Sequence, residues 1–269
     1  MDIVLALVLG AALQLACVVI GRLAERKSAA SFGLNLQLLI VHDLVFAAAR
    51  PLIAGSVALA ANAIGGGFVA LPSAGWGLLL SVVVYAIVAD LLAYWIHRAE
   101  HRFAVLWAFH SLHHSDVDMN VSTTSRHHCL EQLLQTFVIS LVAGTVFKVT
   151  PVIVGAHALL MLYNFFSHCD LRVSFGRWCA VLNCPQFHRL HHSQLPEHRD
   201  CNYAAVFTFF DVLFGTYRQP QIGEYPPTGI DGDERPHGLA QALAWPSRFI
   251  GRGASPHISH GGETIDLGR

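Results

Sequence analysis

Long apolar runs separated by short polar connections dominate the first two-thirds of the chain. Residues 3–20 carry no charge over 18 positions, which is close to the length a helix needs to cross a bilayer core. No basic stretch precedes this run and no small-residue cleavage site follows it, so it is interpreted as a retained anchor helix rather than a cleavable signal peptide. The loop 21–27 carries Arg22, Arg26 and Lys27, which predicts that it lies on the cytoplasmic side.

Two further apolar stretches follow before residue 100. The stretch 36–64 includes His42, Asp43 and Pro51. Because proline removes a helix hydrogen bond, we expect a kink or a break at Pro51. Residues 76–96 are predicted to form another span, returning the chain to the cytoplasmic side.

The apolar region 133–166 is too long for one ordinary span. It is divided at 148–151, and each half is short for a full crossing at about 1.5 Å per residue. We therefore predict a helical hairpin that enters the membrane and returns, leaving the segments on both sides of it on one face. Residues 219–269 are rich in proline and glycine at their start and are predicted to form an irregular tail.

The composition agrees with a membrane protein and excludes one class of partner. Of the 269 residues, 54% are hydrophobic and 13% charged, whereas soluble domains carry roughly 25% charged residues. The net charge is −1, so the chain lacks the basic excess that binding to nucleic acid requires. Six cysteines form no CxxC pair, and we expect them to be inert buried residues.

Histidines provide the strongest chemical signal. The chain has 17 of them, and eight fall in three compact groups with spacings of three and four residues, which place side chains on one helical face. Crowding so many imidazoles at a membrane boundary is costly unless a metal engages their lone pairs. Isolated histidines such as His42 and His157 are instead expected to be structural. The three groups are His97 with His101, His110 with His113 and His114, and His188 with His191 and His192.

The residue pattern alone leaves the metal open. Imidazole suits iron, copper, nickel and zinc, and eight ligands suffice for two ions. The zinc-protease motif HExxH is absent, because Glu100 directly precedes His101. Histidines at helix ends also occur in ion pathways, so a histidine-rich membrane metal-binding or transport protein is the alternative function.

The motifs resemble those of the fatty acid hydroxylase and sterol desaturase superfamily. The stretch 90–115 is similar to the first half of its pattern, and 164–168, 187–193, 200–203 and 210–216 are similar to the second half. This resemblance implies that nine histidines bind two iron ions. These are His97, His101, His110, His113, His114, His168, His188, His191 and His192.

The resemblance also suggests which residues support the ligands. Metal-bound imidazoles usually donate their other N–H to a carboxylate or carbonyl. His128 is expected to support the ligands rather than bind metal, and Asn164 stands where some members have a further histidine. The acids expected to accept hydrogen bonds from the ligands are Asp90, Glu131, Asp200 and Asp211.

Together these features predict an all-α, multi-pass integral membrane bundle of about four spans or hairpin helices. Residues 1–84 are expected to form N-terminal membrane helices, 85–220 the catalytic domain with a cytoplasmic helical cap, and 221–269 the tail. The resemblance implies an O2-dependent di-iron enzyme that hydroxylates or desaturates a fatty acyl, sterol-like or ether lipid. Because no G-x-G-x-x-G fingerprint is present, electrons are expected from an external small cytochrome or a ferredoxin with its reductase.

Overall fold

The computed structural model describes residues 3–25, 31–65, 67–148 and 150–250. Within these ranges the protein is built of α-helices, short 3-10 helices and loops, with two isolated β-bridges. The α-helices are α1 (Ile3–Glu25), α2 (Phe32–Ala63), α3 (Trp76–Arg102), α4 (Ala104–His114), α5 (Cys129–Val146), α6 (Pro151–His168), α7 (Pro185–His191), α8 (Phe209–Phe214) and α9 (Leu239–Leu243). The 3-10 helices are η1 (Val121–Ser125), η2 (Gly176–Ala180), η3 (Pro196–His198), η4 (Asp231–Asp233) and η5 (Trp245–Arg248).

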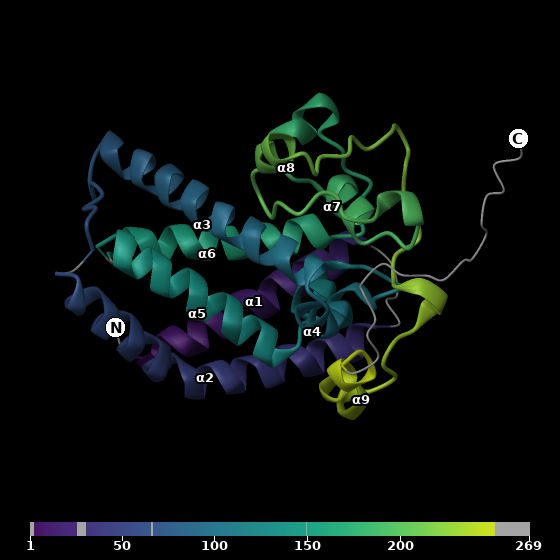
Figure 1. Cartoon of the computed structure of the whole chain (residues 1–269), viewed down its shortest axis with the longest axis horizontal. Coiled ribbons are helices and arrows are strands. Elements are labelled where there is room, and N and C mark those ends of the chain that lie inside the picture. Colours follow the sequence, from purple (N-terminus) through teal and green to yellow (C-terminus); the bar gives the residue numbers. More distant parts are fainter. Residues whose placement is uncertain (1–2, 26–30, 66, 149, 251–269) are drawn as a thin grey trace, which may run out of the picture.

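The long helices form a bundle with α7 and α8 gathered at one end (Figure 1). Helices α2, α3 and α5 are each long and apolar enough to cross a membrane, and α6 is a shorter apolar helix. Only 6% of the most apolar part of α2 is buried inside the protein, so its apolar side chains face outward, as in a lipid-facing helix. The predicted helical membrane bundle is confirmed. The side chains of residues 3–11 lie outside the described part of α1.

Helix α2 continues through Pro51. It runs from Phe32 to Ala63, so of the two outcomes expected at Pro51, a kink or a break, the break does not occur. A proline costs one helix hydrogen bond, and a 32-residue helix retains enough others to continue through it. Helix α3 also extends past the predicted span to Arg102. The boundary expected between residues 84 and 85 therefore falls inside this helix. One rigid helix thus joins the membrane bundle to the first histidines.

The hairpin predicted between residues 133 and 166 is confirmed as α5 and α6. The turn between them lies at the far end of the bundle from α7 (Figure 1). There Val69 and Phe147 form a parallel β-bridge. The start of α5 and the end of α6 therefore lie at the same end, beside α4 and α7.

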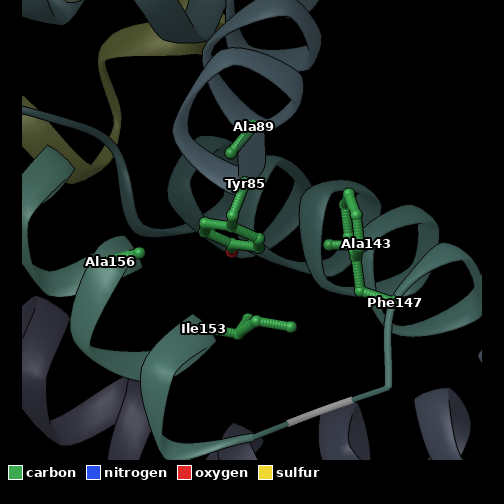
Figure 2. Close-up of a cluster of buried hydrophobic side chains, with 6 residues drawn as sticks. All are labelled: Tyr85, Ala89, Ala143, Phe147, Ile153 and Ala156. Carbon is green, nitrogen blue, oxygen red and sulfur yellow. The ribbon is translucent and has the colours of Figure 1, made fainter. Parts of the chain in front are cut away.

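Helix α3 packs against both arms of this hairpin. Tyr85 and Ala89 of α3 are buried against Ala143 of α5 and Ala156 of α6, with the Tyr85 ring directed into the space between the helices (Figure 2). The Tyr85 hydroxyl lies 3.2 Å from His157 Nδ1, so His157 is structural, as expected. Small side chains allow the close approach, and the packing fixes the direction in which α3 reaches the histidines.

The part of the predicted tail up to residue 250 packs on the protein. Trp245 is 1% exposed, and its indole N–H donates to Ser111 Oγ at 3.0 Å. It lies in an apolar cluster with Leu38 and Leu112. The segment thus braces α4, which carries three of the predicted ligands. Residues 251–269 lie outside the described part of the chain.

Candidate metal centre

Nine histidines from four helices meet at one end of the bundle, and they are the nine ligands that the sequence predicts. The last turns of α3 supply two, α4 supplies three, the last residue of α6 supplies one, α7 supplies two, and the ninth is His192, which caps the end of α7. They form two neighbouring clusters. The first cluster is His97, His101, His110, His114 and His191, and the second cluster is His113, His168, His188 and His192.

The two clusters are held side by side by consecutive histidines. Neighbouring positions on a helix point about 100° apart, so His113 joins the second cluster while His114 joins the first. His191, the last residue of α7, and His192, the residue that caps this helix, are divided between the clusters in the same way. The rings of His114 and His192 stack, with centroids 4.4 Å apart. Each HH pair therefore contributes to both clusters, an arrangement suited to a dinuclear centre.

Nitrogen atoms converge within each cluster. In the first, His114 Nε2 lies 3.1 Å from His101 Nε2 and 3.2 Å from His110 Nε2. In the second, His168 Nε2 lies 3.1 Å from His113 Nε2 and 3.0 Å from His188 Nε2. Two imidazole nitrogens bound at ~2.1 Å to one ion, 90–110° apart, are themselves ~3.0–3.4 Å apart. These separations fit shared metal ions.

Hydrogen bonds among the imidazoles cannot satisfy all of these converging Nε2 atoms. A ring nitrogen offers either one proton or one lone pair, yet the Nε2 atoms of His114 and His168 each face two other Nε2 atoms. The Nε2 atoms of His97 and His191 are buried without any hydrogen-bond partner among the described residues. Leaving a buried polar atom unsatisfied costs ~1–3 kcal/mol. The donor set therefore fits metal binding.

Outward-facing Nδ1 atoms fix the orientation of several rings. His97 Nδ1 lies 2.7 Å from the Tyr203 carbonyl oxygen, and His191 Nδ1 lies 2.8 Å from the Cys201 carbonyl oxygen. Because a carbonyl only accepts, each Nδ1 carries the proton and each Nε2 presents its lone pair to the cluster. His168 Nδ1 donates in the same way to the backbone oxygen of Asn164, at 2.7 Å.

Burial keeps the imidazoles neutral. The pKa values of His113, His114 and His192 lie well below the usual value for histidine. The larger cause is the loss of solvent on burial, and the smaller is repulsion from neighbouring histidines. Burial likewise lowers the pKa of His191 to about 3. Metal binding requires deprotonated imidazole nitrogen, so these rings are in the competent form at neutral pH.

Glu131 is the acid that contacts a predicted ligand directly. Its Oε1 accepts hydrogen bonds at 2.8 Å from His110 Nδ1 and from His127 Nδ1. The His127 ring stacks on His113, with centroids 3.9 Å apart. Glu100 Oε2 lies 3.5 Å from His110 Nδ1, and Glu100 is buried. One carboxylate thus orients a ligand of the first cluster and a ring that packs on the second.

Asp90 and Asp211 support the centre through a loop. Asp211 accepts from the backbone N–H groups of Tyr203 and Ala204, at 2.8 and 3.0 Å. Asp90 accepts from the backbone N–H of Phe207 at 2.7 Å. The loop that they hold presents the carbonyl groups that orient His97 and His191. These two acids therefore act on the imidazoles through the loop backbone, and not through the direct hydrogen bonds that the sequence predicts.

Comparison with known proteins gives the family. The family model described as fatty acid hydroxylase matches residues 82–216, half of the chain, and this segment includes all nine clustered histidines. The chain belongs to the fatty acid hydroxylase family. No solved structure matches it.

Several curated proteins resemble this family member. Ornithine lipid hydroxylase OlsE of Rhizobium tropici is 29% identical over 177 residues, which are 66% of this chain and 53% of that protein. Alkylglycerol monooxygenase of Danio rerio is 34% identical over 129 residues, 48% of this chain and 28% of that protein. A very-long-chain aldehyde decarbonylase of Oryza sativa subsp. indica is 26% identical over 151 residues, 52% of this chain and 23% of that protein. The chain thus spans about half or less of the length of these relatives.

Three of the predicted supporting residues lie elsewhere in this fatty acid hydroxylase family member. The structure does not bring the His128 ring to the clusters: its Nδ1 accepts from Leu130 N–H at the start of α5, and its Nε2 lies 3.1 Å from the Leu243 oxygen. Asn164 contacts His168 through its backbone oxygen, not its amide. Asp200 accepts from the Tyr203 hydroxyl at 3.0 Å, and that ring packs 5.1 Å from His101, centroid to centroid.

His127 and Glu100 are supporting residues that the sequence analysis missed. His127 precedes Glu131 by four residues, a helical pairing distance, and this spacing was a usable signal. Helix α5 begins only at Cys129, however, so His127 reaches Glu131 from the preceding loop. Glu100 lies beside His101 in the sequence, and only the packing of α3 against α4 brings it to His110.

Two cavities reach the clusters of this family member from different sides. The first has a volume of about 290 Å³ and is lined mostly by residues that follow α7, so we call it the cap-side cavity. It borders His101, His114 and His191, and its wall includes the charged residues Arg199 and Glu234. The membrane-side cavity, about 220 Å³, lies among residues of α1, α2, α3, α5 and α6. It borders members of both clusters, which are His97, His110, His168 and His188.

Proposed function

We propose that this chain is a membrane-bound, O2-dependent oxidoreductase that hydroxylates or desaturates a lipid. The observation that carries the proposal is the pair of histidine clusters, which open onto a cavity between membrane helices. Membership of the fatty acid hydroxylase family supports the reaction class, as do relatives named as a lipid hydroxylase and a monooxygenase.

We propose two iron ions as the metals, one for each cluster. The all-imidazole donor set suits iron among other metals, and the reaction class favours iron. Bound iron supplies O2 activation and the oxidising power for cleaving a C–H bond. The nine histidines hold the ions, while Glu131 and the carbonyls of Cys201, Tyr203 and Asn164 fix the imidazoles in the tautomer that exposes Nε2.

A lipid substrate follows from the position of the membrane-side cavity. Its wall includes Leu39, Met161 and Phe165 from α2 and α6, so an apolar chain can be accommodated without meeting bulk water. The relatives named for ornithine lipid and alkylglycerol act on amphiphiles, by their names. We infer that the lipid enters between the membrane helices and presents a C–H bond to the face shared by both clusters.

The cap is proposed to face the cytoplasm. The carboxylate at the end of α1, Glu25, accepts hydrogen bonds from the backbone N–H groups of Val121 and Asp170, so this end of α1 lies beside the cap. The segment 21–27 includes the last turn of α1 and carries Arg22, Arg26 and Lys27, and such basic segments beside membrane helices are retained in the cytoplasm. An external small cytochrome or a ferredoxin is proposed to supply electrons from that side.

The arrangement of the ligands favours oxygenation over metal transport. A transport path requires ligands at successive depths across the bilayer. The nine histidines instead converge at one end of the bundle, within two adjacent clusters. This convergence suits a fixed centre.

Lipid analysis of cells with and without the protein tests the proposal. Under 18O2, hydroxylation predicts a lipid that gains one labelled oxygen atom, whereas desaturation predicts a lipid that loses two hydrogen atoms. Cells producing His113→Ala provide the control, because this variant lacks a ligand of the second cluster. Identical lipid profiles in all three strains, with the iron-loaded protein present in the membrane, would contradict the proposed function.

A further inference from the structure

The membrane-side cavity has a polar lining that a purely hydrocarbon ligand does not need. Five polar side chains of the long helices border it, in addition to the histidines of the metal centre and to Thr124, Ser125, His127 and Tyr203. We call these five the polar lining. They come from four helices and are Gln14 of α1, His42 of α2, Gln132 and Gln135 of α5, and Asn164 of α6.

Most of these amides lack partners in the protein. The side chains of Gln14, Gln132 and Asn164 make no hydrogen bond to any residue in the described part of the chain. Gln135 donates through Nε2 to Glu100 Oε1 at 2.8 Å and keeps its own oxygen available. A polar group at membrane depth is costly unless something hydrogen-bonds to it, and such groups usually mark a functional site.

The two cavities differ in whether charged side chains border them. No lysine, arginine, aspartate or glutamate is among the described residues that border the membrane-side cavity. The cap-side cavity, by contrast, includes Arg199, Arg248 and Asp231. Moving an ion out of water is unfavourable unless an opposite charge meets it, and the side chains of the membrane-side cavity supply none from these residue types. An anion in this cavity would depend on the metal centre alone. An amide or hydroxyl pairs instead with a neutral donor or acceptor.

We propose that the membrane-side cavity binds, through the polar lining, an uncharged hydrogen-bonding linkage of the lipid, a carbonyl-containing amide or ester. This inference rests on the proposed function and specifies its substrate class. The same cavity borders His97, His110, His168 and His188. The carbon that is oxidised therefore lies near the uncharged linkage.

Binding of matched lipids to the iron-loaded, full-length protein under argon tests this inference without turnover. The four probes share a sixteen-carbon chain and are hexadecanamide, methyl hexadecanoate, hexadecanoate and hexadecane. Because one or two neutral hydrogen bonds change affinity by ~10-fold, the amide and the ester should each bind ~10-fold more tightly than the alkane at pH 7.5. The carboxylate can bind the metal centre itself, so it serves as the reference for binding that does not use the polar lining. An amide preferred over the ester would identify a ligand that also donates.

Substitutions then assign the effect to the polar lining. Gln132→Leu and Gln14→Leu, on different helices, should each weaken binding of hexadecanamide and methyl hexadecanoate by ~10-fold and leave that of hexadecane unchanged. Gln37→Leu is the matched control, because Gln37 is exposed on α2 and does not border the cavity. Thermal unfolding of each variant verifies that it is folded.

The outcomes distinguish this inference from the proposed function. If hexadecane binds as tightly as hexadecanamide, or if neither glutamine variant changes the ranking, the inference is wrong while lipid binding stands. If none of the four lipids binds, the inference is wrong, and the comparison of cell lipids under 18O2 decides the proposed function separately. Tight binding of the amide and ester that depends on Gln132 and Gln14 but not on Gln37 establishes the polar lining as a determinant of specificity.

Discussion

His110 donates from Nδ1 to Glu131 Oε1 across 2.8 Å, and the same ring directs Nε2 to within 3.2 Å of His114 Nε2. The carboxylate thus sets both the tautomer and the orientation of a ring in the first cluster. His127 shares this carboxylate oxygen and stacks on His113 of the second cluster. Glu131 therefore links the two clusters, although it belongs to neither as a predicted ligand.

Replacing Glu131 by Gln should weaken metal binding. Loss of the anionic acceptor lowers the basicity of His110, and changes of this kind typically reduce metal affinity by ~10–100-fold. Glu197→Gln, a change at an exposed acid in η3, is the matched control. Iron retained after dialysis against a chelator measures the effect, and equal retention by both variants would show that Glu131 does not support the centre.

The neighbours His127 and His128 should behave differently when each is changed to Ala. His127→Ala removes the stacking on His113 and one donor to Glu131, so we expect ~10-fold weaker iron retention. His128→Ala removes the side chain that caps α5 and should cost ~0.5–2 kcal/mol of stability with iron retention unchanged. Chelator dialysis and thermal unfolding of both variants measure these effects. If only His128→Ala lost iron, His128 and not His127 would be the residue that supports the metal centre.

Asp211→Asn should loosen the loop that orients His97 and His191. An amide has one oxygen in place of two, so the backbone N–H of Ala204 or of Tyr203 would face a second donor. An unsatisfied buried group of this kind costs ~1–3 kcal/mol. Asp233→Asn, at an exposed residue, should change stability by less than ~0.5 kcal/mol. Comparable unfolding midpoints for the two variants in detergent would argue against the bracing role.

Acid should destabilise the metal-free protein. Burial lowers the pKa of His113, His114 and His192 well below its usual value, whereas in the unfolded chain these groups return to ~6.5. Below that pH the unfolded state binds more protons, so the free energy of unfolding falls as pH drops, by up to ~1.4 kcal/mol per pH unit for each such histidine. The thermal midpoint of the metal-free protein should decrease between pH ~6.5 and ~5, and a constant midpoint would contradict neutral, buried imidazoles.

Much of the centre was predictable from local spacing. The three- and four-residue separations fix which histidines share a helical face, and the divided apolar region 133–166 predicts the hairpin that returns His168 to the same end. Pro51 left a kink and a break both open, because a proline weakens a helix without always ending it. Nothing in the apolar pattern around Pro51 distinguishes a continuous helix from a broken one.

The supporting residues were harder to predict, because they depend on one-residue boundaries and on loops. Whether His127 or His128 faces the clusters depends on α5 beginning at Cys129, and helix ends are uncertain by a residue or two from sequence. Asp211 acts through a loop in which Asp200 and Asn202 adopt φ angles of 57° and 61°. Such left-handed conformations follow no hydrophobic period, so the contacts between that loop and the acids emerge only in the folded chain.

Iron analysis of purified protein tests the metal centre most directly. Protein from iron-supplemented cells, analysed for iron and zinc, should contain about two irons per chain and little zinc, because the nine histidines form two adjacent clusters. His168→Ala, which removes a histidine of the second cluster, should lower the iron content. A wild-type protein that holds one iron per chain, or zinc in place of iron, would contradict the assignment of a di-iron centre.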